Sequence, residues 1–289
     1  GNFNTYIGQT SGRSNTDGRS NTFAGVESGY DNTTGFYNVF IGDSTGIDNG
    51  AGYGNTFVGQ SAGARNEHAD HNTFIGKGAG QRNNVSNGTG NANNNTYVGF
   101  HCGDRNEEGQ YNVIMGANAD HGADGTDYSV GIGQGVTVGT GSSDRDYIIV
   151  VGAQSSANGN NTVVLGGQAS ATGSNNIVLG DQASTSSDGT VTMGSSANTT
   201  ATNSVAVGYQ SSVTASNSMA LGYQASVTTA NEVYLGNSSI TSVGGVVNWT
   251  ATSDQRFKTS VKENVAGLNF IDRLRPVTYQ HDANLLHQT

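Results

Sequence analysis

The chain has 289 residues, of which 33% are hydrophobic and 12% are charged, with 44 glycines, one proline and a formal net charge of −10. So little apolar material excludes a large central core, and the acidic balance argues against a partner nucleic acid, whose phosphates need basic residues. No run approaches the roughly 18 apolar residues of a membrane-spanning helix, so we expect no insertion of this segment into a bilayer. The sequence begins within a repeat at Gly1, and we expect it to be a piece of a longer protein.

A glycine in constant register divides most of the chain into short repeats. The steps between these glycines are mainly 17 residues in a first block, residues 1–147, and mainly 14 residues in a second block, residues 148–247. A fixed short period predicts a solenoid whose repeats stack on one another. The glycines in this register are Gly8, Gly25, Gly42, Gly59, Gly76, Gly99, Gly116, Gly133, Gly152, Gly166, Gly180, Gly194, Gly208, Gly222 and Gly236.

The first block combines this signature glycine with an aromatic residue two positions before it. Phrases such as "NTFVGQSAG" also carry a second glycine four residues after the first. We expect the residues one and three before the signature glycine to point inward, so the aromatic residue between them should point out of the roll. An exposed aromatic row would require cover, and therefore predicts an interface between subunits. The row comprises Tyr6, Phe23, Phe40, Phe57, Phe74 and Tyr97.

The second block defines both walls of one coil. In "NTVVLGGQASATG", Val163 and Leu165 would face inward from one strand, with Ala169 and Ala171 on the opposing wall. Glycine would turn the chain between the walls, and Asn161 would form the other corner in left-handed geometry. These features predict an all-β parallel solenoid, or β-roll, of about fifteen coils and on the order of 70 Å in length.

Two phrases of this block, "NSVAVGYQSSVTA" and "NSMALGYQASVTT", resemble the head repeats of YadA-like trimeric adhesins. The resemblance is specific over about residues 148–247 and looser over the first block. It implies three left-handed β-rolls around a threefold axis, and hence a homotrimer with the aromatic row at its interface. The later counterparts Val164, Val178, Ala206 and Ala220 would then lie between chains as well.

The tail, residues 248–289, has a different character. Its phrase "SDQRFK", a helical spacing from Val261 to Leu274 and then "LRPVTY" resemble the start of the intramolecular chaperone domain of endosialidase and tail-fibre proteins. That resemblance implies a short α-containing segment that assists trimer folding. It also makes Ser253 a candidate nucleophile for self-cleavage, with Lys258 as its base. We favour the alternative in which Ser253 or Asp254 caps the start of the helix.

Three further features suggest sites, although a simpler interpretation is favoured for each. His68, Asp70 and His71 have a spacing that could bind a metal, but a solvated turn is the favoured explanation. The acidic stretch from Asp120 to Asp127 lacks the spacing of a calcium loop. Cys102 stands where other coils have small wall residues, which indicates a packing role. We therefore expect no cofactor and no metal.

A structural fibre is the favoured function. Polar turns rich in Asn, Ser, Thr and Gly would be presented to a cell-surface glycan or receptor, which places the protein outside the cell for host attachment. The chaperone-like tail favours a phage or injection-system tail fibre, with a secreted bacterial surface adhesin as the alternative. Enzymatic activity is not expected, because the coils lack the convergent carboxylates of a polysaccharide-cleaving site, and self-cleavage at Ser253 is the further alternative.

Overall fold

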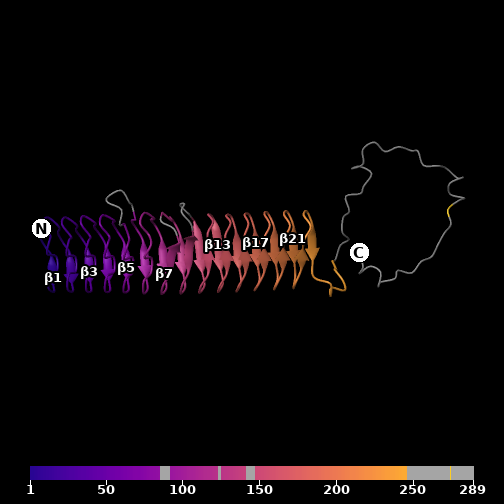
Figure 1. Ribbon diagram of the computed structural model, residues 1–289, viewed down its shortest axis with the longest axis horizontal. Helices are drawn as coiled ribbons and strands as arrows, with labels where there is room; N and C mark the ends of the chain where they lie inside the picture. Colours follow the sequence, from indigo (N-terminus) through magenta and orange to yellow (C-terminus); the bar gives the residue numbers. More distant parts are fainter. Residues whose placement is uncertain (85–91, 123–124, 141–146, 246–273, 275–289) are drawn as a thin grey trace, which may run out of the picture. The chain divides into compact units, whose positions relative to one another are not determined.

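The computed structural model describes residues 1–84, 92–122, 125–140, 147–245 and Leu274. The chain divides into two units, Gly1–Ile240 and Thr241–Thr289, and the first unit is a stack of coils (Figure 1). The predicted C-terminal helix, Ser253 and Lys258 lie outside the described residues.

One long parallel sheet contains a strand from every coil. Each of its fifteen strands pairs with its equivalent in the next coil, without a register shift, as in Thr56↔Thr73 and Phe57↔Phe74. This confirms the predicted parallel solenoid of about fifteen coils. In order, the strands are β1 (Thr5–Ile7), β2 (Thr22–Ala24), β3 (Val39–Ile41), β4 (Thr56–Val58), β5 (Thr73–Ile75), β6 (Thr96–Val98), β7 (Val113–Met115), β9 (Val130–Ile132), β11 (Ile148–Val151), β13 (Thr162–Leu165), β15 (Ile177–Leu179), β17 (Val191–Met193), β19 (Val205–Val207), β21 (Met219–Leu221) and β23 (Val233–Leu235).

The opposing wall is a second parallel sheet of eight strands, which begins only at β8. In the earlier coils the same wall consists of turns. The residues predicted for this wall in the later coils, such as Ala169 and Ala171, are buried as expected. The strands are β8 (Asp120–Gly122), β10 (Thr137–Thr140), β12 (Ser156–Ala157), β14 (Ser170–Ala171), β16 (Ser184–Thr185), β18 (Asn198–Thr199), β20 (Ser212–Val213) and β22 (Ser226–Val227).

The two corners of each coil need unusual backbone angles. The signature Gly59 has a φ of 130°, and a Cβ atom there would overlap the carbonyl oxygen of Gly76 in the next coil. Only glycine satisfies both conditions, which explains its constant register. At the other corner Asn161 has a φ of 54°, and Asn175, Asn203, Asn217 and Asn231 repeat this geometry. The predicted left-handed corners are therefore confirmed.

The aromatic row lies inside the roll, so the prediction that it points outward is wrong. Phe23, Phe40, Phe57, Phe74 and Tyr97 are all 0% exposed within a single chain. Consecutive rings in this series stack with centroids 4.8 Å apart and nearly parallel planes. Tyr6 joins the stack at its N-terminal end and is 37% exposed. The later counterparts Val164, Val178, Ala206 and Ala220 are likewise buried inside their own chain.

The second glycine of the first-block coils explains how a large ring fits inside. A Cβ atom on Gly63 would collide with the ring of Phe57, because this glycine lies directly against it. A coil of 17 residues, three more than the later 14, also encloses a wider interior. The residues that flank the ring on its strand then point to the outside, which inverts the expected orientation of every strand.

Two ladders of asparagine side chains fill the rest of the wide coils. In one ladder Asn49 donates from Nδ2 to Asn32 Oδ1 at 2.8 Å and to the Gly52 carbonyl at 2.7 Å. In the other, Asn55 Oδ1 accepts the backbone N–H of Asn72 at 2.9 Å. These buried amides satisfy turn backbone groups that no sheet pairs, which makes the polar interior compatible with folding.

Candidate functional site

The outer face of the long sheet carries many exposed apolar side chains. The side chains one and three positions before each signature glycine form two columns along the roll, and many are aliphatic. Monomeric soluble proteins rarely leave a continuous apolar sheet face uncovered. Large members of these columns, 37–66% exposed, are Ile7, Ile41, Ile75, Met115, Ile132, Ile149, Leu165, Ile177, Met193, Leu221, Val233 and Leu235.

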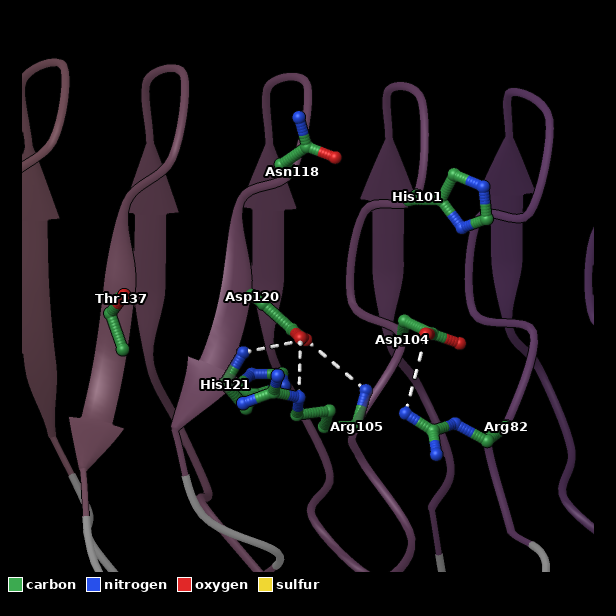
Figure 2. Close-up of a pocket in the computed structure, with 8 residues that line it drawn as sticks. All are labelled: Arg82, His101, Asp104, Arg105, Asn118, Asp120, His121 and Thr137. Atoms are coloured by element: carbon green, nitrogen blue, oxygen red, sulfur yellow. Dashed lines mark hydrogen bonds and ion pairs between the residues drawn. The ribbon is translucent and has the colours of Figure 1, made fainter.

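A polar groove of about 370 Å³ lies on the opposite wall, where that wall changes from turns to strands (Figure 2). Asp120 and His121 of β8 and Thr137 of β10 contribute to it from the start of the eight-stranded sheet. The turns of three successive coils supply the remaining lining residues, which are Arg82, His101, Asp104, Arg105 and Asn118. The long sheet lies behind these residues in the view of Figure 2.

Two ion pairs organise the groove. Arg82 Nη2 lies 3.3 Å from Asp104 Oδ2, and Arg105 Nε lies 3.6 Å from Asp120 Oδ2. Asp120 also accepts the backbone N–H groups of Arg105 and His121, at 3.1 and 2.9 Å. Burial nevertheless raises the pKa of Asp120 to about 6, because desolvation of the carboxylate outweighs these hydrogen bonds.

His121 contributes backbone to the groove, whereas its ring belongs to the interior of the roll. The ring is fully buried and meets Tyr97 edge-on, with centroids 5.6 Å apart. Neither ring nitrogen has a hydrogen-bond partner among the described residues. Desolvation therefore lowers the pKa of His121 to about 4. The neutral imidazole closes the aromatic stack at β8, the first strand of the second sheet.

The structure gives the metal candidates a role in the turns. Asp70 Oδ1 accepts the backbone N–H of Tyr53 at 2.9 Å, and the Asp70 N–H donates to Asn93 Oδ1 at 2.7 Å. His71 occupies the left-handed corner and packs edge-on against Tyr53, while His68 is exposed. In the described part of the chain, no group of three His, Cys, Asp or Glu residues could hold a metal.

The acidic stretch and Cys102 have comparable structural positions. Asp127 Oδ1 accepts the backbone N–H of Gln110 at 2.6 Å, as Asp120 does for Arg105. Cys102 is buried in the wall, with its Sγ 3.1 Å from the Ile114 carbonyl oxygen, and burial raises its pKa to about 12. Its predicted place as a small wall residue is confirmed.

Sequence reasoning missed the groove, although part of its signal was visible. Arg65, Arg82 and Arg105 each follow a signature glycine by six residues, in three consecutive coils. The acidic partners Asp104 and Asp120 do not share such a register. Only stacking of the coils brings them beside the arginines.

Comparison with known proteins identifies the repeats of the second block. The profile of the YadA head domain repeat matches residues 149–169, 157–183, 186–211, 200–225 and 214–231. These coils are therefore similar to YadA head repeats. The crystal structure of the collagen-binding domain of the Yersinia adhesin YadA is 28% identical, over 50% of this chain and 78% of that chain, with a TM-score of 0.43. No curated protein matches the sequence. The described residues include no helix with the length and apolar character needed to cross a membrane.

Proposed function

We propose that this chain is the head segment of an extracellular, adhesin-type fibre that assembles as a homotrimer and attaches to a cell surface. The observation that carries the proposal is the apolar outer face of the long sheet, which a single chain leaves open. The YadA-like repeats of the second block support the same assembly. With this geometry, the trimer interface is made by the aliphatic columns, and the aromatic row instead forms the core of each subunit.

A structural role fits the rest of the molecule better than catalysis. The charged residues of the groove are engaged in ion pairs or backbone hydrogen bonds, and Cys102 is buried with a raised pKa. The rod therefore presents its polar turns at a fixed spacing, which suits repeated contacts with a surface glycan or receptor.

Assembly through the long sheet can be tested by placing charges on the aliphatic columns. We expect the double variant Ile75→Lys and Ile177→Lys to sediment as a monomer, because six lysines would have to be buried in each trimer. The matched control carries Gln168→Lys and Ser226→Lys, at exposed positions outside these columns, and should remain trimeric. A wild-type chain that is monomeric at micromolar concentration, or a trimer that tolerates the Ile75 and Ile177 substitutions, would contradict the proposal.

The assignment to a phage tail fibre and the chaperone role of the tail depend on residues 248–289, and both stay predictions. Deletion of residues 250–289, together with whatever follows them in the full-length gene, should lower the yield of soluble trimer. Ser253→Ala should leave this yield unchanged. Normal trimer yield from the deleted form would exclude the chaperone role, and loss of a natural cleavage product in Ser253→Ala would support self-cleavage.

A further inference from the structure

Positive charge is concentrated at one edge of this acidic rod. The described residues include only six lysines and arginines, and three of these arginines occupy equivalent positions in consecutive coils: Arg65, Arg82 and Arg105. All three are exposed, and the backbone N–H of Arg65 bonds to Gln81 in the next coil at 2.9 Å. With about 4.8 Å between coils, they form a column of guanidinium groups parallel to the rod axis.

The groove holds two of these guanidinium groups without saturating them. Each makes a single nitrogen–oxygen contact, from Arg82 to Asp104 and from Arg105 to Asp120, and the two arginine side chains remain 45% and 66% exposed. A guanidinium group has five N–H donors in a planar fork. The ion pairs therefore orient the groups and leave donors that can bind a carboxylate or sulfate.

The same groove contains an unsatisfied acceptor. Asp104 Oδ1 is buried and has no hydrogen-bond partner, although Oδ2 of the same carboxylate pairs with Arg82. A buried carboxylate oxygen without a donor costs free energy. The Asp104 side chain is 24% exposed, so a small rotation that brings Oδ1 into the groove would let a ligand hydroxyl supply the missing donor. Asn118 and Thr137 add further polar groups at the rim. The ligand that fits must therefore offer acidic groups and hydroxyl donors together.

We propose that this groove and the arginine column bind an acidic polysaccharide, whose carboxylates or sulfates contact Arg65, Arg82 and Arg105 while a sugar hydroxyl donates to Asp104 Oδ1. An acidic peptide fits less well, because its acidic side chains would meet Asp104 and Asp120 and supply no hydroxyl donors. The inference rests on the proposed attachment function and names its ligand. The groove lies on the wall opposite the apolar sheet face, so it stays open in a trimer assembled through that face.

Calorimetric titration of the full chain at low ionic strength tests the site, with a galacturonate hexasaccharide as the probe. Maltohexaose, which is neutral, and hexa-aspartate, which is an acidic peptide, are the comparison ligands. We expect only the galacturonate to bind tightly. Arg82→Gln and Arg105→Gln should each weaken it about tenfold, whereas Arg13→Gln, at an exposed arginine of the first coils, should have no effect.

Asp104→Asn separates a saccharide site from general attraction between charges. Removal of a negative charge should strengthen the binding of any anion. In Asp104→Asn the amide oxygen should face the Arg82 donor, so that the NH2 group replaces the Oδ1 acceptor and an acidic sugar binds several-fold more weakly. Stronger galacturonate binding in Asp104→Asn, equal binding of hexa-aspartate, or absence of galacturonate binding would each overturn the proposal. Sedimentation of the same samples distinguishes failure of the site, in which the trimer persists, from failure of the proposed assembly.

Discussion

A double-mutant cycle on Phe57 and Gly63 would test whether the aromatic row forms the core of a single subunit. Phe57 is fully buried between Phe40 and Phe74, with ring centroids 4.8 Å away on each side. Gly63 has a φ of 57° and lies against the ring, so a Cβ atom there would overlap it. The two residues are complementary in size within one coil, and their substitutions should therefore be coupled.

The structure sets the expected magnitudes. Phe57→Ala should lower the free energy of unfolding by about 3–5 kcal/mol, as other buried phenylalanine truncations do. Gly63→Ala should cost about 1–2 kcal/mol for its left-handed backbone and about 1–3 kcal/mol more for the collision with the ring. In the Phe57→Ala background only the backbone cost remains. The double variant should thus be about 1–3 kcal/mol more stable than the sum of the single effects predicts.

Guanidinium unfolding at matched protein concentrations measures all four corners of the cycle. Tyr37→Ala is the control, because this tyrosine is 59% exposed on the same block of coils and its truncation should change stability by less than about 0.5 kcal/mol. Additive effects of Phe57→Ala and Gly63→Ala would refute the packing argument. So would a Phe57→Ala variant as stable as the Tyr37→Ala control.

Asn49→Leu should lower the free energy of unfolding by about 2–4 kcal/mol, since the Gly52 carbonyl and neighbouring amides lose buried partners; a loss below about 1 kcal/mol in urea titrations would contradict this. Cys102, with its pKa near 12, should react with iodoacetamide at pH 8 more than about a hundredfold slower in the native than in the unfolded chain, and comparable rates would show that the wall opens. Between pH 6 and 4 His121 gains its proton only in the unfolded state, because its native pKa is about 4, and this lowers the free energy of unfolding as pH falls. Asp120 gains its proton only in the native state, because its native pKa is about 6, and this raises the free energy of unfolding as pH falls. The two effects on stability should therefore nearly cancel. Asp120→Asn should leave stability falling by about 1.4 kcal/mol per unit as pH drops through this window, and His121→Leu should reverse the slope; urea midpoints at several pH values that show parallel profiles in both variants would contradict the assignment.

The number of coils and their corners could be predicted because a single chemical requirement repeats. Gly59 and its equivalents need a positive φ and a close approach to the next coil, so no other residue replaces them and the register is visible by eye. The left-handed corner of Asn161 and the thin wall of Ala169 and Ala171 have similarly local causes. A structural feature can be predicted from the sequence when the backbone conformation or the side-chain volume of a single residue determines it.

The inward face of each strand could not be predicted in the same way. In "NTFVG" the residues at alternate positions are apolar on both faces, so alternation alone does not say whether Phe57 or Val58 points inward. The same error affects the narrow coils, where Val164 is buried and the predicted inward residue Leu165 is 40% exposed. The information that decides the question is Gly63, six residues away, whose missing side chain makes room for the ring.

The groove depends on features that no single coil contains. The pairs Arg82–Asp104 and Arg105–Asp120 join residues of neighbouring coils, at different positions relative to their signature glycines. Such contacts between different repeat positions of neighbouring coils follow from the stacking distance and from side-chain length. An alignment of the repeats to a consensus does not reveal them. The arginine column alone could have been found once the coils were aligned.

The groove lies where the opposing wall changes from turns to strands. The stacked aromatic core ends at Tyr97, and the next coil holds Ile114 on one wall and His121 on the other. In this same coil the opposing wall changes from turns into β8, the first strand of the second sheet. Charged side chains of the last turns and the first strand meet at this change, as Arg105 and Asp120 do. Both the turns and β8 belong to the first block, so the groove depends on the type of wall and not on the later 14-residue period. By this reasoning, a rod whose opposing wall was of one type throughout would lack the groove.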